Sequence, residues 1–191
     1  METFDWVKKA FTEGAIFTAF DLETTGLEAR ADRIVEIGAV KFDRRGLIAR
    51  FSTLIDPGIP MPVEAGRVNH ITDEMLKGKP CLDEVLPDFL LFIKGTVITA
   101  HNAPFDCGFI NEKLKAGGLA PFSALPNPVA DTLLLSRERF PGFRSHSLQN
   151  LAAELGIPAL DAHRAEDDAR LCMEIFIRIH SLTHTPKKEY H

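Results

Sequence analysis

The sequence has few cysteines, and the three that it has lie far apart. Cys81, Cys107 and Cys172 are an odd number and share no close spacing. Neither a disulfide framework nor a zinc site built from paired cysteines fits this pattern. We therefore expect reduced thiols in a cytoplasmic protein.

Long apolar runs are also missing. No stretch approaches the ~20 apolar residues that a membrane-spanning helix needs. The first fourteen residues contain acidic and basic side chains and lack the apolar core of a signal peptide. These absences argue against secretion and against a membrane partner.

An excess of positive charge is the third absence. The formal net charge is −5 over 191 residues, whereas a protein that neutralises many phosphates is usually basic. A polyanionic substrate would have to be held locally, by metal ions and by a few arginines. The candidates are Arg137, Arg139, Arg144 and Arg164. The apolar content of 45% is typical of a soluble globular protein with one sizeable core.

The patterning that is present predicts one α/β domain. The apolar run from Ile16 to Leu22 predicts a strand buried on both faces. Alternation over 33–43 and 50–56, around a turn at 43–46, predicts a hairpin, and further strands are expected over 96–100 and near Val129. Helices are expected over 1–13, from 72, and over 82–94, 102–116, 147–155 and 164–181. We divide the chain into an N-terminal helical extension (1–14), a main domain (15–182) and a short polar tail (183–191).

Two carboxylates close the first strand. Period-two alternation places Asp21 and Glu23 on one face, just before a Thr-Thr-Gly turn. Like charges this close repel, and burying them without a partner is costly. A divalent cation such as Mg²⁺ or Mn²⁺ would resolve both problems. The alternative is a strand end in solvent with two hydrated acids.

Two further acids lie on the apolar faces of predicted helices. Asp106 shares its face with Phe109, Ile110 and Leu114, which would direct its carboxylate inward. The alternative is an acid favoured in a first turn by the helix dipole. Asp168 aligns with the apolar stripe of the last helix, formed by Leu171, Cys172, Ile175 and Ile179.

The neighbours of Asp168 differ from it in direction. Asp167 lies about 100° away around the helix, so we expect it to face water. His163 precedes the helix and must approach from the preceding loop, as a mobile base could. The alternative for a lone loop histidine is an ordinary surface position.

Together these stretches resemble the DEDD superfamily of 3′–5′ exonucleases, in the subgroup whose third motif contains a histidine. That subgroup includes the proofreading exonucleases of bacterial replicative polymerases and related RNA-trimming enzymes. The likeness covers about residues 15 to 180, and its motifs are Asp21-Leu-Glu23-Thr-Thr-Gly, His101-Asn-Ala-Pro-Phe-Asp106 and His163-Arg-Ala-Glu-Asp-Asp168. The resemblance implies a ribonuclease H-like fold, with a mixed five-stranded sheet, an antiparallel second strand and flanking helices.

The resemblance also implies a metal-dependent exonuclease. It would hydrolyse phosphodiester bonds at 3′ ends, with single-stranded DNA favoured, and release nucleoside 5′-monophosphates in DNA replication or repair. By resemblance, Asp21 would bridge two Mg²⁺ or Mn²⁺ ions, Glu23 and Asp168 would complete one ion, and Asp106 would hold the other through water. His163 would remove a proton from the attacking water.

The resemblance suggests substrate contacts as well. Thr24 and Thr25 would lie near the terminal sugar, and Phe105 would either contact a base or pack in the core. Family members often have His-Gly-Ile after the third strand, whereas this chain has Asn69-His70-Ile71. Either Asn69 or His70 could therefore contact the terminal nucleotide.

Other functions compete with this one. They are an exoribonuclease acting on short or single-stranded RNA, a non-catalytic polymerase accessory module, and a small-molecule phosphoesterase using the same metal pair. All four acids and the histidine are present, which disfavours a module without catalysis. A DNA polymerase is a candidate partner, although only about ten residues follow the last predicted helix, which argues against a polymerase-binding tail.

Overall fold

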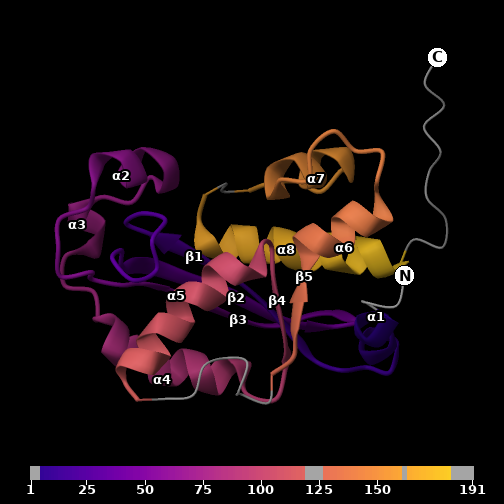
Figure 1. Ribbon diagram of the computed structural model, residues 1–191, viewed down its shortest axis with the longest axis horizontal. Helices are drawn as coiled ribbons and strands as arrows, with labels where there is room; N and C mark the ends of the chain where they lie inside the picture. The colour runs from indigo at the N-terminus through magenta and orange to yellow at the C-terminus, as the bar shows by residue number, and fades with distance from the viewer. Residues whose placement is uncertain (1–4, 119–126, 161–162, 182–191) are drawn as a thin grey trace.

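The computed structural model describes residues 5–118, 127–160 and 163–181. Their framework is one mixed sheet with strand order β3-β2-β1-β4-β5 and helices on both faces (Figure 1). This is the expected ribonuclease H-like arrangement. The N-terminal four residues and the predicted polar tail lie outside the described residues.

The strand order follows from one hairpin and two crossovers. β2 is antiparallel to both β1 and β3, and β4 and β5 run parallel to β1. The hairpin turn is closed by Asp43, whose carboxylate accepts a hydrogen bond from the backbone N–H of Arg45 at 2.7 Å. The bounds are β1 Phe17–Thr24, β2 Ile34–Asp43, β3 Gly46–Leu54, β4 Val97–Ala100 and β5 Val129–Asp131.

Each face of the sheet has its own core. On one face, α8 (Ala165–Ser181) packs with α1 (Asp5–Thr12) over β1 and β2, around Phe17, Phe42 and Phe176. On the other face, α4 (Leu82–Ile93) and α5 (Ala103–Ala116) cover the sheet. Because β1 is central, its side chains are covered on both sides, as the apolar run predicts.

The remaining helices are short. Two of them, α2 and α6, are not predicted by the sequence pattern. α2 follows Pro62 and contains a glycine, and α6 has too few residues for a clear periodicity. The bounds are α2 Val63–Asn69, α3 Asp73–Leu76, α6 Thr132–Arg139 and α7 Leu148–Glu154. No helix in the described part of the chain is long and apolar enough to cross a membrane.

The start of α5 differs from the expected cap. Asn102 precedes the helix in a left-handed conformation, and its side chain makes no capping bond. The carboxylate of Asp131 caps instead, accepting from the backbone N–H of Asn102 at 3.2 Å and of Ala103 at 3.1 Å. The same carboxylate accepts from the first turn of α6. One side chain at the end of β5 therefore fixes the start of two helices.

Candidate active site

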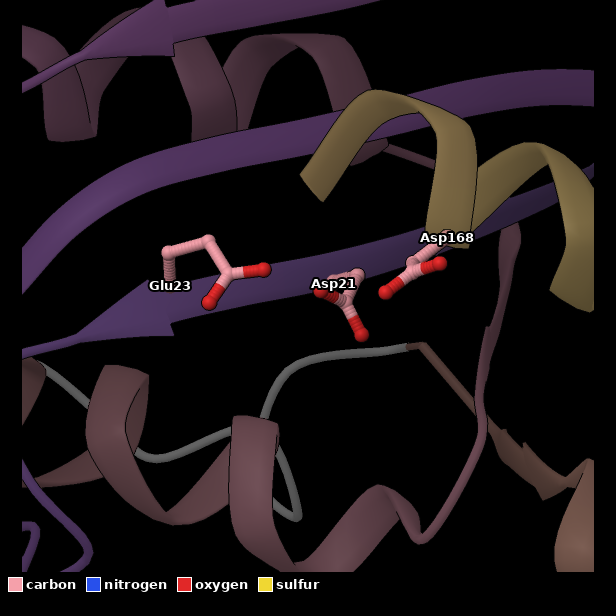
Figure 2. A group of neighbouring side chains, drawn as sticks. All are labelled: Asp21, Glu23 and Asp168. Atoms are coloured by element: carbon pink, nitrogen blue, oxygen red, sulfur yellow. The ribbon is translucent and has the colours of Figure 1, made fainter. Parts of the chain in front are cut away.

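Three carboxylates meet where the end of β1 faces the start of α8. The ligand oxygens of Asp21, Glu23 and Asp168 all lie within 4.8 Å of one another. Figure 2 shows the two β1 side chains beside the first turn of α8, with the three carboxylates directed into a shared space. The strand alternation of β1 and the buried stripe of α8 therefore bring the three carboxylates to one place.

Local structure explains each position. Asp21 and Glu23 alternate with buried residues of β1 and leave the face that α8 covers. Asp168 lies in the first turn of α8, where its backbone N–H donates to the carbonyl of Arg164 at 3.0 Å. A carboxylate there is favoured by the unpaired N–H groups and by the helix dipole.

Burial and mutual repulsion disfavour the charged forms of these acids. Desolvation, with the charge of Asp106 next, raises the pKa of Asp21 well above its usual range. Desolvation and the charges of Asp168 and Glu36 raise the pKa of Glu23 to about 8. Desolvation also raises the pKa of Asp168 to about 6, against the opposing effects of His163 and Gln149. Oxygen ligands that repel one another suit a hard divalent cation, whose charge would offset the repulsion. The donor set therefore fits a metal centre.

Asp106 approaches from the opposite face of the sheet. It is 3% exposed on α5, and its Oδ1 accepts the backbone N–H of Leu22 at 3.1 Å. The register of β4 against β1 ends at Ala19, so β4 does not pair with Leu22. Desolvation raises the pKa of Asp106 to about 8. Asp106 lies outside the three-carboxylate group but close enough for its charge to act on Asp21.

Two exposed histidines lie beside this cluster. His163 precedes α8 with φ 63°, and His70 follows α2 with φ 58°. Their ring centroids are 6.5 Å apart. The charge of His163 acts on Asp168, and a backbone hydrogen bond from His163 also reaches that carboxylate. His163 is therefore an exposed residue beside Asp168, as a mobile base would need to be.

The predicted substrate-contacting residues divide into exposed and buried ones. Of the pair left open by the sequence, His70 is exposed. Asn69 is 2% exposed and bridges Thr24 and Ile71 through its amide. Phe105 is half-buried and packs against Phe109, with ring centroids 5.1 Å apart.

The two threonines after Glu23 shape the turn that follows β1. The hydroxyl of Thr24 donates to the carbonyl of Gly26 at 2.6 Å. The hydroxyl of Thr25 donates to Asp32 and accepts from the backbone N–H of Arg33. Both side chains are buried, so the hydroxyls hold the loop between β1 and β2.

The expectation that Asp167 faces water is wrong. Asp167 is 8% exposed, and its carboxylate accepts from Arg170 at 2.7 Å and from the backbone N–H of Leu160 at 2.9 Å. Leu160 and Pro158 lie against this side of α8, which helix geometry alone cannot reveal. Asp167 and Asp168 are both buried but have different partners.

Two polar side chains at this site are not predicted by the sequence pattern. Gln149 on α7 donates to Oδ1 of Asp168 at 2.7 Å. Glu36 lies opposite Glu23 on β2 and is 1% exposed. A signal existed for Glu36, because a charged residue interrupts the apolar run of β2. Gln149 carried no comparable signal.

Similarity to known proteins agrees with this geometry. The sequence matches the Exonuclease family over residues 18–176. It is 50% identical over 190 residues to DNA polymerase III subunit epsilon of Treponema pallidum, covering 98% of this chain and 86% of that protein. It is 42% identical over 159 residues to the PolC-type DNA polymerase III of Clostridium perfringens, covering 83% of this chain and 11% of that longer protein.

A solved structure is similar over most of its length. Exonuclease X in complex with 5′-overhanging duplex DNA superposes with a TM-score of 0.68 and 27% identity, covering 85% of this chain and 90% of that one.

Proposed function

This chain belongs to the Exonuclease family and is a 3′–5′ exonuclease, and we propose that it trims DNA 3′ ends and releases nucleoside 5′-monophosphates. The observation that carries the proposal is the group of Asp21, Glu23 and Asp168, whose ligand oxygens lie within 4.8 Å of one another. Asp106 stands beside them, across β1.

The four carboxylates would hold two divalent cations, Mg²⁺ or Mn²⁺. Asp21 would be shared, Glu23 and Asp168 would complete one ion, and Asp106 would serve the other. Bound cations of this kind stabilise charge on the attacking and leaving oxygens during displacement at phosphorus. The raised pKa values of Glu23 and Asp106 support this assignment, because each carboxylate lacks a nearby positive charge sufficient to offset its burial.

His163 would accept the proton of the attacking water. Its exposed position beside Asp168 lets the imidazole reach a water molecule at the cluster and return the proton to solvent. The imidazole must be neutral for this step, since only the neutral ring has a free acceptor nitrogen. His70, whose ring neighbours that of His163, would contact the terminal nucleotide.

DNA is the proposed substrate because the similar proteins are named as a DNA polymerase III or its epsilon subunit, or are solved in complex with DNA. The polymerase names support a DNA polymerase as partner, and with it DNA replication or repair as the process. An acidic chain neutralises few phosphates, so we expect it to grip the 3′ end through the metal centre more than through a broad basic surface.

An end-labelled digestion tests the proposal. Single-stranded DNA, duplex DNA and RNA of one sequence, labelled at the 5′ end, are incubated with Mg²⁺, with Mn²⁺ and with excess chelator. We expect stepwise shortening from the 3′ end of DNA that stops in chelator. Shortening from the 5′ end, or full activity in chelator, would contradict the proposal. Faster digestion of RNA would assign the substrate to the other nucleic acid.

A further inference from the structure

Glu36 is a buried acid beside the active site that the proposed mechanism does not use. It lies on β2, pairs in register with Glu23, and is 1% exposed. Yet its oxygens are outside the group formed by Asp21, Glu23 and Asp168. A carboxylate this buried needs partners, because an unpaired buried charge is costly.

Three hydrogen bonds provide those partners, two from Arg164 just before α8 and one from Ala165, the first residue of α8. Arg164 donates through Nε to Oε2 at 3.1 Å and through a terminal nitrogen to Oε1 at 2.7 Å. The backbone N–H of Ala165 donates to Oε2 at 3.1 Å. A two-point guanidinium–carboxylate pair fixes orientation as well as distance. Glu36 therefore joins β2 to the two residues that follow His163.

The backbone of α8 is also pressed against β2 at this point. Gly38 lies two residues after Glu36, on the same face of the strand. A Cβ at Gly38 would come within 2.1 Å of the backbone of Ala165 and Glu166. The first turn of α8 thus rests directly on β2, with Glu36 capping its first N–H group.

His163 lies between two anchored segments. After it, Arg164 and Ala165 are bound to Glu36. Before it, the backbone of Leu160 donates to Asp167, and Arg170 donates to the carbonyl of Pro158. Asp167 and Arg170 belong to α8 itself, whereas Glu36 belongs to the sheet. Among these contacts, only the bonds to Glu36 join the residues next to His163 to the sheet. They reach β2, the neighbour of the strand that carries Asp21 and Glu23.

The conformation of His163 makes such anchoring necessary. Its φ of 63° is a left-handed value that a residue with a side chain adopts at a cost. Such a conformation persists where the surrounding structure enforces it. The residue that follows His163 is Arg164, and Glu36 holds it in place.

We propose that Glu36 is a positioning residue for His163, acting through Arg164 and Ala165. This inference rests on the proposed function, in which His163 accepts the proton of the attacking water. Glu36 holds His163 beside Asp168, which is one of the three carboxylates drawn in Figure 2. Without the ion pair, His163 samples other positions, so proton acceptance slows while the DNA 3′ end still binds.

The chain provides a matched control for this ion pair. At the far end of β2, Asp43 is also buried and binds Arg45 through two guanidinium bonds, at 3.0 and 2.7 Å, and one backbone N–H. E36Q and D43N therefore remove the same kind of interaction from the same strand. R164M breaks the same ion pair by removing the guanidinium in place of the carboxylate.

The experiment combines these variants with H163A. For E36Q, R164M, D43N, H163A and the double variants E36Q/H163A and R164M/H163A, kcat, KM and Tm are measured on single-stranded DNA with saturating Mg²⁺. We expect E36Q and R164M to lower kcat by roughly 10–100-fold, the size of effect that supporting residues have at such sites. KM should stay within about threefold for both, because the guanidinium of Arg164, a candidate phosphate contact from the sequence, is bound to Glu36. D43N should keep kcat within about twofold. Each double variant should be no slower than H163A, because residues acting as a unit are non-additive.

The outcomes separate this inference from the proposed function. If H163A retains full activity, the proposed role of His163 fails first. If H163A is slow but both double variants are slower by the full single-variant factors, Glu36 acts on the acidic cluster and the inference is overturned. R164M decides alone if E36Q does not fold: a folded R164M enzyme with wild-type kcat also overturns it.

Discussion

The rings of His70 and His163 lie edge to face, with centroids 6.5 Å apart and planes at 68°. Both residues have left-handed backbone conformations, and both are exposed. They come from segments far apart in the sequence, the end of α2 and the start of α8. Their positions are close, but we expect substitutions of the two to affect catalysis differently.

Replacing His163 by alanine should slow the chemical step. General-base assistance is worth about 10²–10⁴-fold, so kcat should fall by that factor while KM changes little. Steady-state kinetics on single-stranded DNA with Mg²⁺ checks this. A variant within about threefold of the wild-type kcat would contradict the role of His163.

Replacing His70 by alanine should weaken substrate binding more than it slows turnover. The loss of one hydrogen bond to the terminal nucleotide corresponds to about 0.5–1.5 kcal/mol, or roughly a two- to tenfold increase in KM. The matched comparison is N69A. Since Asn69 is buried and bridges Thr24 to Ile71, N69A should lower Tm instead. A large fall in kcat for H70A, with KM unchanged, would place His70 in the chemistry.

Substitutions of Asp167 and Asp168 at the start of α8 should have different effects, one on stability and the other on activity. D168N removes a carboxylate from the cluster and should abolish cleavage with either metal while the fold is retained. D167N weakens the contact with Arg170 and should lower Tm, while folded enzyme keeps most of its activity. Activity and thermal unfolding, measured together, check both. An inactive but stable D167N beside an active D168N would show that the wrong acid had been assigned.

Metal-free protein should become less stable as pH rises. The pKa values of Glu23 and Asp106 are about 8 in the fold, well above those of the same groups in an unfolded chain. Between about pH 4 and 8 the folded state therefore binds more protons, and its stability falls with increasing pH. Unfolding in chelator at pH 5.5 and pH 8 checks the sign.

A variant provides the control for that pH effect. E23Q removes one titrating group and should raise the metal-free Tm at pH 8 by about 2–4 °C, the shift that ~1 kcal/mol gives in a domain of this size. Mg²⁺ should raise the wild-type Tm at pH 8 and have less effect on E23Q. Metal-free stability that rises between pH 5.5 and 8 would show that the acids are not desolvated together.

Much of the site could be predicted because it depends on local periodicity. The period of a strand aligns Asp21 with Glu23, and the period of a helix puts Asp168 on a buried stripe. Those rules need no knowledge of partners. Asp106 followed from the same reasoning on α5.

The rest depends on which segments meet, and periodicity does not determine that. Asp167 is covered by Leu160, whose backbone N–H it binds. Glu36 forms an ion pair with Arg164, which is distant in the sequence. Gln149 reaches Asp168 only because α7 packs beside α8. Short helices such as α2 were missed because seven residues give too few repeats of a 3.6-residue period.

The shared cap at Asp131 makes the starts of α5 and α6 one cooperative unit. Its carboxylate accepts N–H groups from both helices, so opening one helix end also breaks the bonds that hold the other. Amide hydrogen exchange should therefore accelerate in both first turns together when Asp131 is replaced by alanine. Since Asp106 lies in the first turn of α5, local opening at the end of β5 should also move the carboxylate that we propose as a metal ligand.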